Sequence, residues 1–362
     1  MKRTKSTIIL LLLIPFFAFS QKKPEEDKKI NFAFIPIISY NRSFGGQFGI
    51  MTNAYFDVNK KDTISPASTI GFYGHIFTNK TFFTGIFNRM YFKEDRWRTK
   101  FGIGYGNINF QSYFDIPEDV PAVWAQDDNG EFIDYNTQMT FIYAEGMRLL
   151  FDHLYLGMRI VFSGVNTEFD DENIPDESLS LFGFGLMTEY DKRDNVFNPH
   201  TGFNARFKHF SFLESLGSSQ TYHRINIDYN QYFPLGENSL IMGRIYAMIS
   251  VGDSVPFNGK NVVGRDDLRG YTDGKYRANH VYDLQTEYRW NFYKKWGMVA
   301  FGGIAIATDD WQGNNYSGIL PAIGAGLRFK AIPKRNINVG IDAAIGKEDW
   351  GLYFRIGETF TR

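Results

Sequence analysis

The chain has 362 residues, with 39 basic and 40 acidic side chains, six histidines and no cysteine. This balance gives no case for nucleic-acid binding, and the lack of cysteine excludes disulfides and lipid attachment through a cysteine. Aromatic residues make up 17% of the chain, although the mean hydropathy is only −0.30. The combination is typical of membrane barrels, where apolar and polar residues alternate and aromatic girdles lie at both interfaces.

The N-terminus has the pattern of a secretory signal. A basic start is followed by a short apolar run at 8–17 and by small residues before Gln21. We therefore expect residues 1–20 to be a signal peptide, residues 21–30 to be a short periplasmic leader, and residues 31–362 to be one barrel domain. The expected location is the outer membrane of a Gram-negative cell, with outer-membrane lipid as a partner.

Sixteen segments alternate between apolar and polar residues, as half-exposed strands do. Each is long enough to cross a bilayer as a tilted strand, which takes about 9–11 residues. Single-chain outer-membrane barrels have even strand numbers, so the sequence predicts an all-β, sixteen-stranded antiparallel transmembrane barrel. The segments are 31–41, 43–57, 67–79, 81–94, 97–111, 135–150, 153–167, 178–191, 202–213, 221–233, 238–252, 280–292, 296–308, 318–330, 335–346 and 349–360.

The alternation is clearest in the segment 280–292. A strand with one aromatic and apolar face and one ionisable face suits a wall between lipid and water. A barrel of sixteen strands has a water-filled lumen, so the polar face is not buried in a dry core. A soluble antiparallel sandwich with one wet face is the alternative. The apolar face carries Tyr282, Leu284, Thr286, Tyr288, Trp290 and Phe292, and the polar face carries Asp283, Gln285, Glu287, Arg289 and Asn291.

Most connections alternate in length along the chain, and the stretches 79–81 and 58–66 are the two exceptions. Outer-membrane barrels have short periplasmic turns and long outer loops, so the pattern places the N-terminus on the periplasmic side. The connection 253–279 is rich in Gly, Asp and Arg, and we expect it to be too polar to pack as a core element. The short connections are 95–96, 151–152, 234–237, 293–295 and 331–334, and the long ones are 112–134, 168–177, 253–279 and 309–317.

One of the periplasmic turns carries a recognisable motif. Asp191, Arg193 and Asn195, followed by Pro199 and Gly202, resemble the D-x-R-x-N…P-x-x-G turn of the BamA/TamA/FhaC superfamily of outer-membrane barrels, the bacterial surface antigen family. The opening hairpin of the barrel is similar as well. The resemblance implies that these residues are the periplasmic turn motif of the barrel.

Two strands later, Leu268, Arg269, Gly270 and Tyr271 resemble the V/I-R-G-F/Y motif in that superfamily's long sixth loop. The resemblance implies that the loop 253–279 folds into the lumen and that Arg269 pairs with an acidic group on the wall. Glu287, on the polar face of the next strand, is the expected partner.

The following strand departs from the family pattern. Its F-x-D-x-G motif would supply a second acidic partner, but Gly303 occupies the aspartate position. Arg269 is therefore expected either to pair with Glu287 alone or to gain Asp342 from a nearby strand. A charge-assisted pair that is shielded in a lumen is stronger than a surface ion pair.

The resemblance also implies a function. We expect a barrel that assists protein or lipid insertion or translocation at the outer membrane, with a separate periplasmic subunit or client protein. Because the barrel begins soon after the leader, the chain resembles a member lacking POTRA domains. In the family, the seam between the first and last strands can loosen as a lateral gate, and Gly351 and Gly357 fit a weaker closing strand.

Two other functions remain open at this stage. One is a passive pore or structural barrel, and the other is an adhesin or surface antigen acting through the outer loops 112–134 and 168–177. Catalysis is not expected, because the histidines are scattered and no nucleophile motif is present. No catalytic residue, metal site or cofactor is predicted, since the acidic outer loops complete no calcium-binding pattern.

Overall fold

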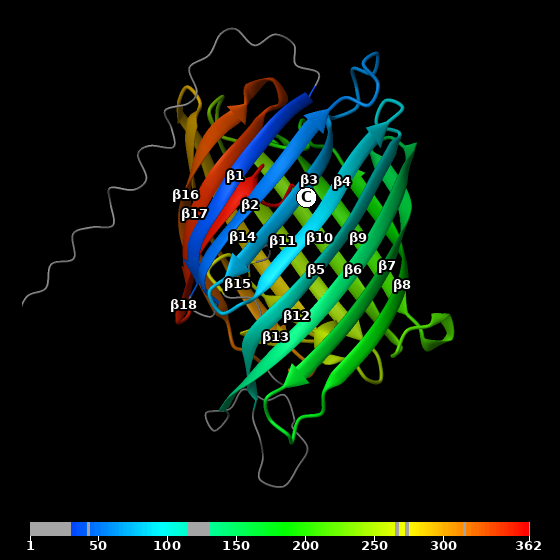
Figure 1. Ribbon diagram of the computed structural model, residues 1–362. Helices are drawn as coiled ribbons and strands as arrows, with labels where there is room; N and C mark the ends of the chain where they lie inside the picture. The colour runs from blue at the N-terminus through cyan, green and yellow to red at the C-terminus, as the bar shows by residue number, and fades with distance from the viewer. Residues whose placement is uncertain are drawn as a thin grey trace, which may run out of the picture.

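The computed structural model describes residues 30–41, 44–114, 131–264, 268–271, 275–313 and 316–361. The expected signal peptide, residues 21–29 of the leader and residues 115–130 of the first long outer connection lie outside the described residues. Sixteen strands form one antiparallel sheet whose order follows the chain, and the sheet curls into a barrel (Figure 1). Within the described ranges, no helix is both long and apolar enough to cross a membrane.

Every expected segment forms a strand, which confirms the predicted sixteen-stranded antiparallel barrel. Two further short strands, β12 and β13, pair with each other inside the long connection after β11. The barrel strands are β1 (Ile30–Asn41), β2 (Gly45–Phe56), β3 (Ser68–Phe77), β4 (Phe82–Phe92), β5 (Trp97–Phe114), β6 (Glu131–Phe151), β7 (Leu154–Phe169), β8 (Glu177–Asp191), β9 (Gly202–Phe212), β10 (Tyr222–Pro234), β11 (Ser239–Val251), β14 (His280–Tyr293), β15 (Trp296–Thr308), β16 (Leu320–Ile332), β17 (Ile337–Gly346) and β18 (Asp349–Ile356), and the additional hairpin is β12 (Asn261–Val263) with β13 (Tyr276–Ala278).

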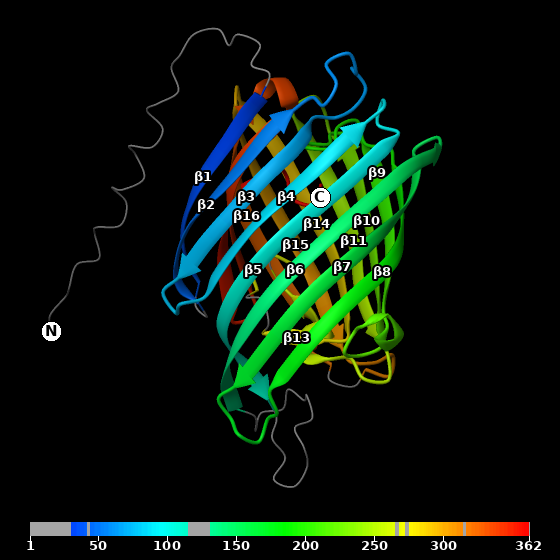
Figure 2. The same ribbon diagram turned by 45° about the vertical axis from the view of Figure 1, so that its right-hand side comes forward.

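Alternation gives the wall two different faces. On β14, Leu284 is 53% exposed on the outside, whereas Glu287, on the opposite face, is fully buried. The same period of two runs through the other strands, because successive side chains point to opposite sides of a sheet. The long strands β5 to β8 project past the others at the lower end of the barrel in Figure 2. The turns 93–96, 152–153, 235–238 and 294–295 lie at the other end, which is called the short-turn rim below.

The two ends of the sheet, β1 and β18, meet at a seam. They lie next to each other, but no backbone ladder joins them within the described residues. Both strands have features of sheet edges. Pro36, in the middle of β1, has no N–H, and proline occurs in sheets essentially only on edge strands. β18 has only eight residues, which limits the ladder that it can form.

The seam is held at the short-turn rim by side chains. Arg335, in the turn between β16 and β17, donates to both carboxylate oxygens of Asp57 at 2.7 and 3.0 Å and to Asn31 Oδ1 at 2.8 Å. These contacts connect the last strands of the sheet to the first two. A small apolar cluster that includes Ala33, Tyr55 and Ile337 packs beneath them. The seam is therefore fastened at one end by side chains rather than along its length by backbone hydrogen bonds.

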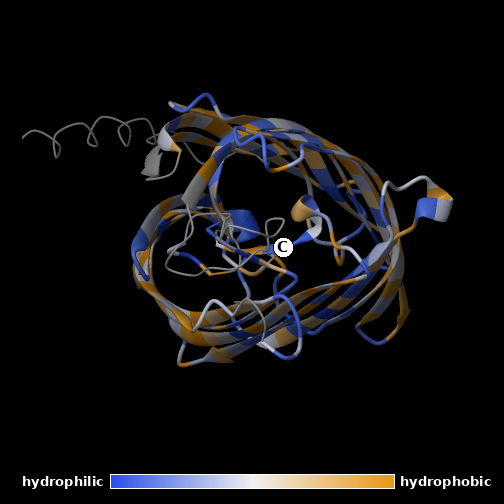
Figure 3. Cartoon of the chain, turned by 90° about the horizontal axis from the view of Figure 1, so that it is seen from below, coloured by the Kyte–Doolittle hydropathy of each residue, from blue (hydrophilic) through white to orange (hydrophobic). Residues whose placement is uncertain are grey.

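The end of the chain corrects the predicted last strand, 349–360. The strand stops at Ile356, and Gly357 adopts a φ of 85°, which favours glycine. Phe360, the last residue of the predicted strand, is only 6% exposed. The C-terminus lies within the outline of the barrel from the side (Figure 1) and from below (Figure 3). Residues 358–361 are called the terminal segment below.

Candidate functional site

The turn between β8 and β9 holds the first predicted group of residues. Arg193 donates from Nε and Nη2 to the two oxygens of Asp191, at 2.7 and 2.8 Å. Arg98 on β5 also donates to Asp191, at 2.7 Å. Burial lowers the pKa of Arg193, but the adjacent Asp191 carboxylate outweighs burial, so the pKa lies above its ordinary value. Arg193 is therefore a permanent cation at the rim.

The rest of the motif shapes the backbone of the same turn. Asn195 accepts hydrogen bonds from the amides of Phe197 and Asn198 at 2.9 and 3.0 Å, which is the local pattern that makes asparagine a turn former. Pro199 is buried. Gly202 has a φ of 92°, and a Cβ added there would lie 2.0 Å from the Lys192 carbonyl oxygen. Only glycine fits at that position.

The loop motif has a separate contact for each of its four residues. Leu268 is 2% exposed and packs with Tyr271 and Val281. Gly270 has a φ of 116°, and an added Cβ would come within 2.9 Å of the β17 backbone at Ile345. Tyr271 donates to the Pro321 carbonyl oxygen at 2.6 Å. These contacts hold the motif against β16 and β17.

Arg269 lies at the centre of the group and is 1% exposed. Its Nη2 donates to Glu287 on β14 at 2.6 Å, and its Nη1 donates to Asp342 on β17 at 2.7 Å. The guanidinium stacks on the Phe301 ring, 3.3 Å from the ring centre. The structure thus brings together Arg269 and both carboxylates that the sequence offered as alternatives.

Three more arginines surround the same carboxylates. Arg289 donates to Glu287 at 2.7 Å, and Asp342 accepts from Arg328 at 2.5 Å and pairs with Arg355 at 2.9 Å. Each of these side chains is less than a tenth exposed. Because each carboxylate contacts at least two guanidinium groups, the charges are compensated in spite of burial. Arg269, Arg289, Arg328 and Arg355 are called the arginine cluster below.

The terminal segment supplies the third carboxylate of this arrangement. Glu358 accepts from Arg328 at 2.9 Å and from Asn338 at 2.7 Å. Thr359 accepts from Arg269 through its hydroxyl and from Arg289 through its carbonyl, both at 3.2 Å. The residues just after β18 are therefore bound to the same guanidinium groups as the loop motif.

The terminal segment also reaches the turn motif, because Arg193 Nη1 approaches the Thr361 carbonyl oxygen at 3.5 Å. The loop motif and the turn motif do not contact each other directly through any hydrogen bond or ion pair found in the described residues. Their connection runs through the chain end. A change at Arg269 is thus in a position to affect the strand that closes the barrel.

Gly303 explains why the second family aspartate is not needed here. A Cβ at this position would lie 2.6 Å from Gln285 Cγ and 3.0 Å from Leu268 Cδ1. The space that an aspartate would take is filled by the first residue of the loop motif. Asp342 provides the second carboxylate instead.

Sequence reasoning missed part of this group. It assigned no role to Arg328, Arg355 or Glu358, and it placed the last of these in a strand. The missed signal was the presence of arginines on the polar faces of the last strands, since ionisable groups inside a membrane pair with one another. The expectation that 253–279 would not pack was also wrong. Its buried residues Val263, Leu268, Tyr271, Tyr276 and Ala278 form an apolar cluster with β14 and β15.

The chain is similar to known outer-membrane barrels. Residues 66–360 match the Omp85 superfamily domain, and no curated protein matches the chain. CdiB from Escherichia coli is similar at a TM-score of 0.62 and 11% identity, covering 92% of this chain and 63% of that chain.

BamA from Haemophilus ducreyi lacking POTRA domains 1-3 is similar at a TM-score of 0.58 and 12% identity, covering 92% of this chain and 70% of that chain. CdiB from Acinetobacter baumannii is similar at a TM-score of 0.58 and 12% identity, covering 91% of this chain and 60% of that chain. The chain thus spans less than two thirds of either CdiB, and the likeness at these identities is one of fold.

Proposed function

The chain belongs to the Omp85 superfamily of outer-membrane barrels, and on that basis we propose that it assists the insertion or translocation of protein, or of lipid, at the outer membrane. Separate periplasmic partners would deliver the client. BamA and CdiB, the proteins with similar barrels, make this class of function the nearest precedent.

The observation that carries the proposal is the seam between β1 and β18. An edge strand offers a row of unpaired N–H and C=O groups, which is a template for pairing with another chain. Within hydrocarbon such groups must be satisfied internally, so an arriving strand gains more there than it would in water. A passive pore has no need of this edge.

The arginine cluster adds a means of control. In the proposed arrangement the loop 253–279 occupies the bore, with Arg269 connecting it to β14, to β17 and to the terminal segment. Because the terminal segment directly continues β18, moving the loop alters the support of the closing strand. The contacts of Arg269 with Asp342 and with Thr359 support this coupling.

Cysteine pairs across the seam test the function, since the chain has no cysteine of its own. Phe34→Cys or Ile38→Cys would be combined with Leu352→Cys, all at exposed positions on the outer face. Once the disulfide has formed across the seam, we expect the assembly of new outer-membrane protein to stop in the native cell. A reductant should restore assembly.

The matched control joins two strands away from the seam. Phe48 and Ile76 face each other on β2 and β3 and are 53% and 54% exposed. A disulfide between cysteines at these positions should leave assembly unchanged. Normal assembly with the seam covalently closed would reject the proposed function.

Conductance separates the proposal from the passive pore. A pore would show a steady open channel that Arg269→Ala does not change. The proposed arrangement predicts low conductance in the native chain and a larger, fluctuating conductance in the variant, because the loop is no longer held to the wall.

A further inference from the structure

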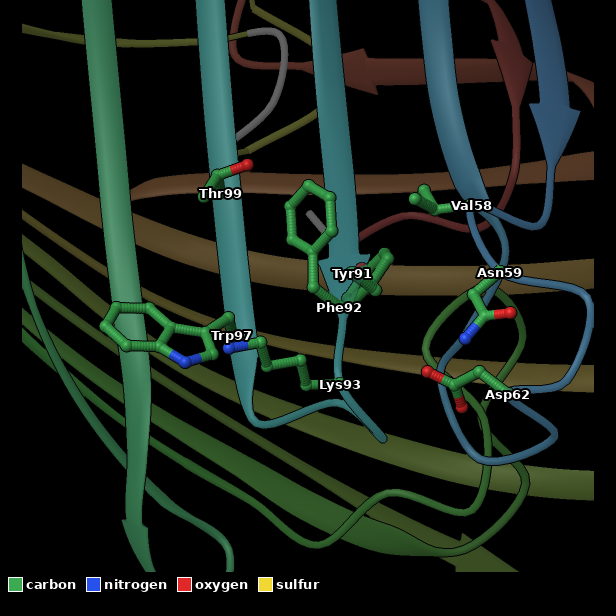
Figure 4. Close-up of a pocket in the computed structure, with 8 residues that line it drawn as sticks. All are labelled: Val58, Asn59, Asp62, Tyr91, Phe92, Lys93, Trp97 and Thr99. Atoms are coloured by element: carbon green, nitrogen blue, oxygen red, sulfur yellow. The ribbon is translucent and has the colours of Figure 1, made fainter.

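A groove of about 500 Å³ lies on the outer face of the barrel, at the short-turn rim (Figure 4). One wall consists of Val58, Asn59 and Asp62, from the connection between β2 and β3. The other consists of Phe92, Lys93 and Trp97, around the turn between β4 and β5. Phe92 and Trp97 share the strand parity of the exposed residues Ile86 and Phe101, so they face away from the bore.

The groove lies at the level of an aromatic girdle. Trp97 is 40% exposed at the start of β5, and at the same rim Phe151, Phe233 and Tyr293 are 66%, 53% and 57% exposed at the ends of their strands. Aromatic residues of this kind lie at the headgroup level of a bilayer. The short turns assign this rim to the periplasmic side.

Hydrogen bonds between the two connections give the groove a fixed shape. The Asp62 carboxylate accepts from Ser65 Oγ at 2.7 Å, from the Ser65 amide at 2.9 Å and from the Glu94 amide at 2.8 Å. Ser65 Oγ in turn accepts from the Asp95 amide at 2.8 Å. A site formed by two connected segments loses little conformational freedom when a ligand binds.

The charge that remains available to a ligand is positive. Asp62 is occupied by its amide and hydroxyl donors, and Asp57 is paired with Arg335 at 2.7 Å. Lys93 lines the groove and is exposed. Arg148, on the neighbouring strand β6, lies over the Trp97 ring at 5.6 Å. Glu94 and Asp57 are exposed carboxylates nearby, and Asp57 is the one paired with Arg335.

We propose that this groove holds one anionic phospholipid of the adjacent leaflet. Its phosphate lies between Lys93 and Arg148. The part of its acyl chain next to the headgroup packs against Val58, Phe92 and Trp97. The apolar walls match the chain, and the cations match the headgroup. Basic residues near a membrane surface each contribute about 1 kcal/mol toward an anionic lipid, which is about a fivefold preference per residue. The site does not depend on the proposed assembly function.

Quenching of Trp97 fluorescence by brominated lipids tests the site. In a variant that keeps Trp97 and replaces the other five tryptophans by phenylalanine, brominated phosphatidylglycerol is compared with brominated phosphatidylcholine in vesicles. We expect at least a fivefold preference for phosphatidylglycerol at Trp97. The double variant Lys93→Ser with Arg148→Gln should bring the ratio of quenching by the two lipids close to one. Asp62→Ala releases one wall of the groove, and it should lower the ratio although both cations remain.

Two controls make the outcome specific. Lys294→Ser removes a lysine beside Tyr293 at the same rim, where the distance to the ring is 4.9 Å, and it should not change the ratio at Trp97. A second variant that keeps only Trp350, 37% exposed at the opposite rim, should not respond to Lys93→Ser with Arg148→Gln. A ratio near one in the parent, which a groove for a protein partner would give, overturns the proposal. Lys294→Ser also overturns it if that change lowers the preference for phosphatidylglycerol at Trp97 as much as the double variant does.

Discussion

Replacing Arg269 by alanine should release the loop 253–279 from the wall. The change removes hydrogen bonds to Glu287, Asp342 and Thr359 and the stacking on Phe301. Hydrogen bonds to charged groups contribute about 1.5–3 kcal/mol each. A buried carboxylate left without any partner would cost about 3–5 kcal/mol.

The expected cost is at the lower end of that range. Glu287 keeps Arg289, and Asp342 keeps Arg328 and Arg355, so neither carboxylate loses all its partners. We therefore expect the free energy of loop release to fall by about 3 kcal/mol, which corresponds to about a hundredfold rise in the open population.

Trypsin cleavage of the folded barrel measures this population. Lys260, within the loop, is 8% exposed, so cleavage after it requires local opening, and its rate follows the opening equilibrium when closing is fast. We expect about a hundredfold faster cleavage after Lys260 in Arg269→Ala. The control is Arg206→Ala, which removes another arginine of the bore, paired with Asp228, and should leave this rate unchanged. A rate in Arg269→Ala that matches the parent, or an equal rise in the control, would refute the reasoning.

Three further predictions concern the contacts around this centre and the groove. Gly303→Asp, which restores the family residue, should lower the stability to urea by about 1–3 kcal/mol, because the new Cβ would meet Leu268 and Gln285; an unchanged midpoint would contradict this packing. Glu358→Gln should make the chain end at least tenfold more sensitive to carboxypeptidase, since it removes a buried charge held by Arg328 and Asn338; equal digestion would mean that the terminal segment is held by other contacts. The amides of Ser65 and Glu94 lower the pKa of Asp62 from 3.8 to about 2, so its stabilisation of the groove is complete above pH 4 and is lost only as the pH falls through 2. Trp97 emission in the single-tryptophan variant should therefore stay constant from pH 7 to 4, and a change that begins near pH 5 would contradict this assignment.

The wall of the barrel could be predicted because a strand between lipid and water needs apolar and polar residues at alternate positions, and the sequence shows this alternation. On β14, one face must meet lipid and the other water, so the sequence alone assigns Leu284 and Glu287 to opposite sides. The contact of Arg269 with Glu287 followed from the same argument together with the family motif. The position of Asp342 could only be offered as an alternative, because it depends on how β17 lies beside β14 across two intervening strands.

The chain end could not be predicted from the same signal. The predicted strand ran on to Phe360 although Glu358 interrupts its apolar face, and one backbone angle at Gly357 turns the chain inward. A glycine in a strand pattern is compatible with both outcomes. What decides is the arginine cluster, whose cations need a third carboxylate. That need is visible only when the strands that carry the arginines are placed together.

The missing ladder at the seam was likewise not a property of either strand alone. Pro36 marks β1 as an edge strand. The predicted number of strands is correct, but a closed barrel of that number would have no edge. The short length of β18 and the inward turn after it leave β1 without a full partner. The same few residues therefore determine the conformation of the chain end and the state of the seam.

A photo-crosslinking residue at Lys192, exposed in the turn between β8 and β9, tests the proposed function most directly in the native cell. The same residue at Trp311, 70% exposed at the opposite end of the barrel, serves as the control. We expect position 192, but not position 311, to capture an unfolded outer-membrane protein or a dedicated periplasmic subunit. Adducts with lipid alone at position 192, while outer-membrane proteins are being assembled, would contradict it.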